Sequence, residues 1–88
     1  MQKIRKDAIL GQNIRSMRVE AGLTQEQVVA RMQLAGCDIS RSIYSQIEGG
    51  TYHIRASELA ALKVIFGVDD NPFFEGIGTE KNFWPRPA

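Results

Sequence analysis

The sequence predicts an all-α fold, a compact domain of four to five helices. Apolar residues recur at helical spacing in four stretches, and glycines or capping residues separate these stretches. No segment longer than a few residues alternates between apolar and polar as a half-buried strand would. With 88 residues, the chain has room for one domain around one modest core.

The first helix is expected from about Asp7 to Ala21. Its apolar stripe consists of Leu10, Ile14, Met17 and Ala21. Gly22 follows as a natural stop, because a left-handed residue commonly ends a helix. Leu23 can then turn inward.

A second helix begins after Thr24. Thr24 and Gln27 are spaced as a capping box, in which each side chain bonds to the backbone of the other residue. Val28 and Met32, with Val29 beside them, give this helix its buried side. We expect it to run to residue 34 or 35, before Gly36.

The third helix is capped by Asp38 or Ser40. Ser40 is favoured, because Ile39 before it can act as an apolar staple. Tyr44 and Ile47 are three residues apart and are expected to face the core. The pair of glycines at 49 and 50 ends this short helix.

A fourth helix is expected over about Ala56 to Phe66, after a loop at 51–55. Its core stripe contains Leu59, Leu62 and Phe66, with Val64 and Ile65 adjoining it, and Gly67 ends it. Farther on, Asn71 as cap and Pro72 as first helical residue predict a final short turn. That turn carries Phe73 and Phe74, which we expect to close the core.

Composition excludes several classes of function. The single cysteine, Cys37, permits no intramolecular disulfide, and one histidine with one cysteine makes no zinc site, so we expect no metal and no cofactor. No apolar run approaches the roughly 20 residues of a membrane helix. No carboxylate pair, nucleophile with a base, or phosphate loop suggests an enzyme. These features fit a cytoplasmic protein.

Charge is distributed unevenly along the chain. Residues 1–63 hold nine basic and six acidic side chains, whereas residues 64–88 hold two basic and four acidic ones. We therefore expect a basic arm at residues 1–6, a folded domain at 7–75 and a tail at 76–88. The arm, with Lys3, Arg5 and Lys6, either reaches DNA or is a solvated end.

Residues 22–28 (GLTQEQV) and 39–50 (ISRSIYSQIEGG) carry a resemblance to a known family. They resemble the lambda-repressor-like, Cro-type helix-turn-helix family, often called the XRE family, over about residues 9–75. The resemblance implies a DNA-binding regulator whose helix at about 40–48 enters the major groove of double-stranded DNA.

The resemblance also implies roles for individual residues. Base-reading positions fall on Arg41, Ser42, Ser45 and Gln46. Arginine can pair with guanine O6 and N7, and glutamine with adenine N6 and N7. Phosphate contacts fall on Gln25 and Ser40, and we add Arg55, the one firm positive charge of the loop at 51–55.

Arg18 and Glu48 match a pair that forms a structural salt bridge between the first and third helices of many family members.

Two features depart from the family pattern. About five extra residues, near 33–38, lengthen the turn between the motif helices. Ile43 replaces a residue that is usually small and polar, and it either contacts a thymine methyl or packs in a rotated helix, which would shift the reading positions by one.

Two functions remain open at this stage. The first is a sequence-specific transcription regulator, most simply a repressor that binds DNA as a homodimer. The second is a protein-interaction module that kept the fold, to which the low net charge, the longer turn, Ile43 and the aromatic tail point. In the tail, Phe83 and Trp84 either pack back, join a second subunit or dock a protein partner. Arg41, and the absence of an acidic residue between Ser40 and Ile47, favour DNA.

Overall fold

Five helical elements make up the part of the chain that the structure describes. The computed structural model describes residues 6–69 and 71–76, so most of the predicted arm and the tail with Phe83 and Trp84 lie outside it. The elements are α1 (Lys6–Glu20), α2 (Gln25–Leu34), α3 (Arg41–Gly49), α4 (Ala56–Phe66) and the 3₁₀ helix η1 (Asn71–Phe74). These described residues form no strand, so the predicted all-α fold is confirmed.

Side-chain caps start the two motif helices where the sequence predicts them. Thr24 Oγ1 accepts from the backbone N–H of Gln27 at 3.1 Å, and Gln27 Oε1 accepts from the N–H of Thr24 at 2.8 Å. Ser40 Oγ accepts from the N–H of Ile43 at 3.1 Å. Each cap satisfies a backbone donor that the first helical turn leaves free.

All four α-helices end at a glycine in the left-handed region, and these glycines are Gly22, Gly36, Gly50 and Gly67. In each case the next residue donates its N–H to a carbonyl five positions earlier, such as Leu23 to Arg18 at 3.1 Å and Thr51 to Gln46 at 3.0 Å. This pattern satisfies carbonyls that the last turn leaves free. The predicted stops are confirmed.

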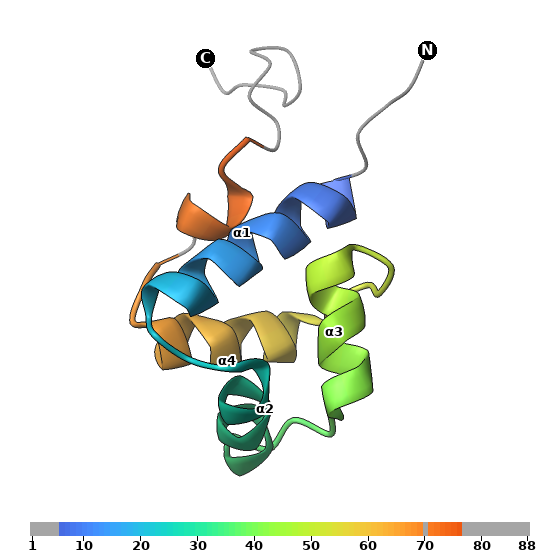
Figure 1. Cartoon of the computed structure of the whole chain (residues 1–88), viewed down its shortest axis with the longest axis vertical. Helices are drawn as coiled ribbons and strands as arrows, with labels where there is room; N and C mark the ends of the chain where they lie inside the picture. Colours follow the sequence, from blue (N-terminus) through green and yellow to red (C-terminus); the bar gives the residue numbers. More distant parts are fainter. Residues whose placement is uncertain (1–5, 70, 77–88) are drawn as a thin grey trace.

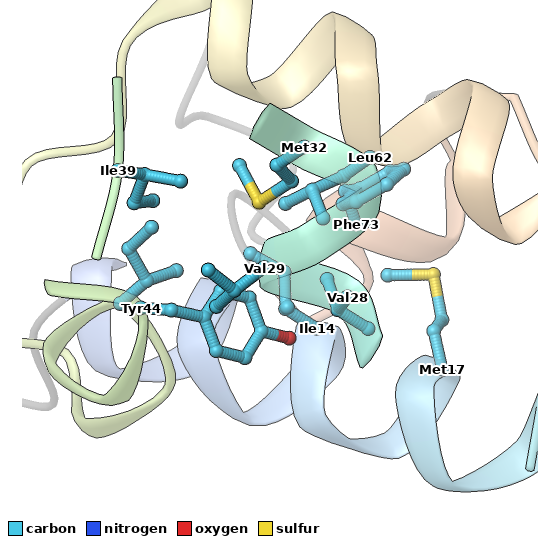
Figure 2. Packing of buried hydrophobic residues seen from close by; sticks show 10 residues of the cluster. Ile14, Met17, Val28, Val29, Met32, Ile39, Tyr44, Leu62 and Phe73 are labelled. Atoms are coloured by element: carbon cyan, nitrogen blue, oxygen red, sulfur yellow. The ribbon is translucent and has the colours of Figure 1, made fainter. Parts of the chain in front are cut away.

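The helices enclose one core. In Figure 1, α2 and α3 lie next to each other at one end of the domain, while η1 lies on α1 at the other. Helix α2 also packs on α4, and α1 packs on α3. Figure 2 shows side chains from all five elements converging between them. The buried cluster consists of Ile14, Met17, Val28, Val29, Met32, Ile39, Tyr44, Ile47, Leu62 and Phe73.

Two glycines set α3 directly against α1. A Cβ atom on Gly11 would lie 2.6 Å from the carbonyl oxygen of Glu48, and one on Gly50 would lie 2.6 Å from the Cα of Ala8. The Glu48 oxygen belongs to the backbone of α3 and the Ala8 Cα to the backbone of α1. Because backbone atoms cannot move aside easily, a side chain at either glycine would force the two helices apart. The orientation of α3 therefore depends on the absence of a side chain at these positions.

The last element closes the core through one aromatic ring. Phe73 is fully buried, and Asn13 Nδ2 donates to the carbonyls of Phe73 and Glu75, both at 2.8 Å. Phe74, expected in the core, is instead 41% exposed. Asn71, expected as the cap of this turn, is instead already part of η1, and its N–H donates to Asp69 Oδ1 at 3.2 Å.

Two further core positions were predicted wrongly. Ala21 is exposed, because α1 ends at Glu20 and the turn at Gly22 carries the chain away from the stripe. Val64 is 82% exposed, although α4 has the predicted bounds. Two residues along a helix correspond to about 200° of rotation, so Val64 faces away from the buried Leu62.

Candidate nucleic-acid interface

The connection between α2 and α3 is long, as the sequence predicts, and it is anchored to the domain. Residues 35–40 separate the two helices. Ile39 is buried, and Gln33 Nε2 donates to its carbonyl at 2.8 Å. Cys37 is half-buried and packs against the core. The extra residues thus form an ordered turn that brings α3 back against α1 and α2.

Helix α3 has two chemically distinct faces. Tyr44 and Ile47 point inward with at most 2% of their surface exposed, and Glu48 is buried beside them. The opposite face is exposed and carries the four predicted base-reading side chains, Arg41, Ser42, Ser45 and Gln46. They recur at one- and four-residue spacings, which place them on one stripe. Over the whole of α3, no acidic side chain is exposed.

Ile43 belongs to the inward side. It is half-buried and packs against the core cluster. The helix is not rotated by this residue, because its predicted inward positions Tyr44 and Ile47 are the ones that are buried. The exposed stripe therefore keeps the predicted register.

A buried ion pair fixes α3 to α1. Arg18 Nε donates to Glu48 Oε2 at 2.7 Å, and Arg18 Nη2 donates to Oε1 at 3.3 Å. Both side chains are nearly buried, with 13% and 4% of their surfaces exposed. Arg18 Nη1 also donates to the carbonyl of Leu23 at 2.9 Å. One guanidinium thus holds the end of α1 and the carboxylate of α3 together.

The environment keeps Glu48 ionised. Burial by itself disfavours the carboxylate, but hydrogen bonds from Arg18 and Gln25 outweigh it, and the pKa of Glu48 is lowered below its ordinary value of 4.5. Conversely, the pKa of Arg18 is raised, mainly by its hydrogen bond to Glu48. The hydroxyl of Tyr44 lies beside this pair, and burial raises the pKa of Tyr44. The pair is therefore charged at neutral pH.

Gln25 joins this buried pair to the exposed stripe. Its Nε2 donates to Glu48 Oε1 at 3.0 Å, while its Oε1 accepts from Ser45 Oγ at 2.9 Å and from Arg41 Nε at 3.2 Å. Arg41 Nη1 also lies 3.4 Å from Glu26 Oε2, an exposed ion pair. Two of the four predicted base-reading side chains are therefore held by the first turn of α2.

The sequence did not predict this network. The family resemblance implied only a phosphate contact for Gln25, and its contacts with α3 were not expected.

The other two residues predicted to contact phosphates lie apart from this network. Ser40 is exposed at the start of α3, and Arg55 is exposed before α4. The backbone N–H of Arg55 donates to Glu58 Oε1 at 2.8 Å, so that loop is fixed through a buried carboxylate that the sequence analysis did not single out.

Other kinds of site are not found among the residues that the structure describes. No group of three or more histidine, cysteine or carboxylate side chains is gathered as a metal would require. None of the helices there has the length and apolar character needed to cross a membrane.

Comparison with known proteins identifies the family. A family model described as a helix-turn-helix domain matches residues 9–73, well over half of the chain. No curated protein and no solved structure matches the chain significantly. Two helices joined by a turn, with a polar face on the second, are the arrangement that this family uses for DNA. The chain therefore belongs to the XRE/Cro-like helix-turn-helix family of DNA-binding domains.

Proposed function

We propose that the chain is a sequence-specific transcription regulator that places α3 in the major groove of double-stranded DNA. The exposed stripe of α3 carries this proposal. It presents hydrogen-bonding side chains and one positive charge, and its inward face is fully used by the core. A major groove admits one such helix, and polar side chains on it can meet base edges. Ile43 no longer supports a protein-interaction module, because it packs inward.

The contacts divide into two classes. Arg41, Ser42, Ser45 and Gln46 meet bases, and Gln25, Ser40 and Arg55 meet phosphates. Arg41 retains its Nη2 for guanine, because its bonds to Gln25 and Glu26 use Nε and Nη1. A single domain of this size covers only a few base pairs. The regulator therefore acts as a homodimer on a palindromic site, in the cytoplasm, and represses by occupying that site.

Selection from a pool of random duplexes tests the proposal. At about 150 mM salt, where non-specific phosphate binding is weakened, we expect an enriched palindrome with half-sites about one helical turn, or roughly 34 Å, apart. Arg41→Ala should cost about 1–3 kcal/mol at that site and relax the preference at one base pair. Arg15→Ala, which removes an exposed arginine from α1, is the matched control.

The result also distinguishes the second function. If no sequence is enriched and Arg41→Ala behaves as the wild type does, specific DNA binding is wrong. The domain would then be a protein-interaction module, and a partner of the tail with Phe83 and Trp84 would be the next target.

A further inference from the structure

The amide of Gln25 has its two ends committed to different partners. Its Nε2 faces the buried carboxylate of Glu48, and its Oε1 faces the exposed side chains of Ser45 and Arg41. An amide nitrogen only donates hydrogen bonds and an amide oxygen only accepts them. The orientation of this one group therefore decides which role each neighbour must play.

Glu48 decides that orientation. Its carboxylate is held by Arg18 at 2.7 Å and is buried, so it is an acceptor without a proton of its own. Only the NH₂ end of Gln25 can meet it favourably. Reversing the amide would bring two acceptors together inside the domain, which costs far more than an exposed mismatch. The oxygen of Gln25 is thus turned toward α3.

This orientation commits the proton of Ser45. A hydroxyl has one hydrogen to donate and lone pairs that accept. At 2.9 Å from an oxygen that cannot donate, Ser45 Oγ must give its hydrogen to Gln25. Only its lone pairs then remain for DNA. Arg41 differs, because every hydrogen-bonding group on its guanidinium donates.

We propose that Ser45 reads DNA only as a hydrogen-bond acceptor, so that the base it faces is adenine or cytosine. In the major groove, adenine N6 and cytosine N4 are donors, whereas guanine and thymine present only acceptors. Arg41, a donor, faces the opposite requirement on the same stripe. This inference rests on the proposed function, and it assigns to the Arg18–Glu48–Gln25 chain a part in specificity beyond holding α3 in place.

The first test uses the site that the selection yields. Each adenine is replaced by 2-aminopurine, which moves the amine out of the major groove, and each cytosine by 2-pyrimidinone, which lacks it. At the position that Ser45 faces in each half-site, we expect the loss of the amine to weaken wild-type binding by roughly 3- to 10-fold, the effect of one hydrogen bond. In Ser45→Ala, the same replacement should have no further effect, because the acceptor is already gone.

The second test releases the proton of Ser45. Gln25→Met keeps a long side chain but removes the acceptor, so Ser45 becomes free to donate. At the Ser45 position, guanine and thymine should lose most of their disadvantage relative to adenine and cytosine. A lost phosphate contact weakens all sequences alike and leaves these ratios unchanged. Gln12→Met, an exposed glutamine of α1, should keep the wild-type ratios.

The outcomes separate this inference from the proposed function. Failure to enrich any sequence would overturn the proposed function. If a site is enriched, yet every amine replacement weakens the Ser45→Ala variant as much as the wild type, that result would overturn only the assignment of Ser45. The assignment would also be overturned if the base pair that Ser45→Ala affects presented guanine or thymine to this residue. The Ser45→Ala comparison stands even if Gln25→Met is poorly folded, because the serine is exposed.

Discussion

Gly11 lies where α1 packs closely against the backbone of α3. With alanine there, the added Cβ would lie 2.6 Å from the carbonyl oxygen of Glu48, and rigid backbone cannot move aside cheaply. Gly11→Ala should therefore destabilise the domain by about 1–3 kcal/mol in urea-induced unfolding, despite the better helix propensity of alanine. It should also weaken DNA binding, because α3 would be displaced.

Gly49 provides the matched control for this prediction. It lies at the end of α3, and nothing would stand within 4 Å of an added Cβ. Gly49→Ala should be neutral or stabilise the domain by up to about 1 kcal/mol, the propensity difference alone. Equal effects of the two substitutions would contradict the close approach of α1 and α3.

At the scale of elements, η1 depends on one of its two aromatic residues. Phe73 is fully buried, whereas its neighbour Phe74 is 41% exposed. Phe73→Ala should cost about 3–5 kcal/mol, because it leaves a cavity in the core as well as losing buried area. Phe74→Ala should cost less than about 1 kcal/mol. Thermal unfolding of the two variants measures the difference, and comparable losses would show that η1 is not held by Phe73.

Element boundaries were predictable because local chemistry sets them. The caps at Thr24 and Ser40, and the glycine stops, act within four or five residues, and the observed bounds differ from the expected ones by about one residue. Burial was less predictable. Val64 lies on an apolar stretch yet faces solvent, since periodicity alone does not say which side of a helix finds a neighbour. Asn71 was expected as the cap of the final turn, but it lies within η1.

The position of the candidate interface could be predicted from the sequence, but the hydrogen bonds that connect its side chains could not. The resemblance placed Arg41, Ser42, Ser45 and Gln46 on α3, and the structure exposes all four. The contacts of Gln25 join residues 16 to 23 positions apart, so no local pattern indicates them. They arise only when α2 and α3 pack together.

At the scale of the whole molecule, the formal charge is only +1. General attraction to the phosphate backbone, which supplies most non-specific affinity, is therefore weak. We therefore expect DNA binding to rely on side chains held in fixed positions, and the network from α1 through α2 to α3 holds Arg41 in place. The elements that stabilise the fold and the residues that we propose face DNA are consequently linked through the carboxylate of Glu48.

That link predicts how the domain responds to acid. The folded state lowers the pKa of Glu48 below 4.5, so the pair with Arg18 contributes its full stabilisation above that pH. This stabilisation disappears as the pH falls through the lowered pKa and the carboxylate takes up a proton.

The variant Glu48→Gln should lose roughly 2–4 kcal/mol of stability at pH 7, because Arg18 keeps a largely buried charge without its counter-ion. Urea unfolding from pH 7 to pH 3 should show the two proteins converging in stability below about pH 4.5, where the wild type loses the advantage that the variant never had. A constant difference across that range would mean that the charge of Glu48 contributes nothing to the fold, and that shape alone holds α3 against α1.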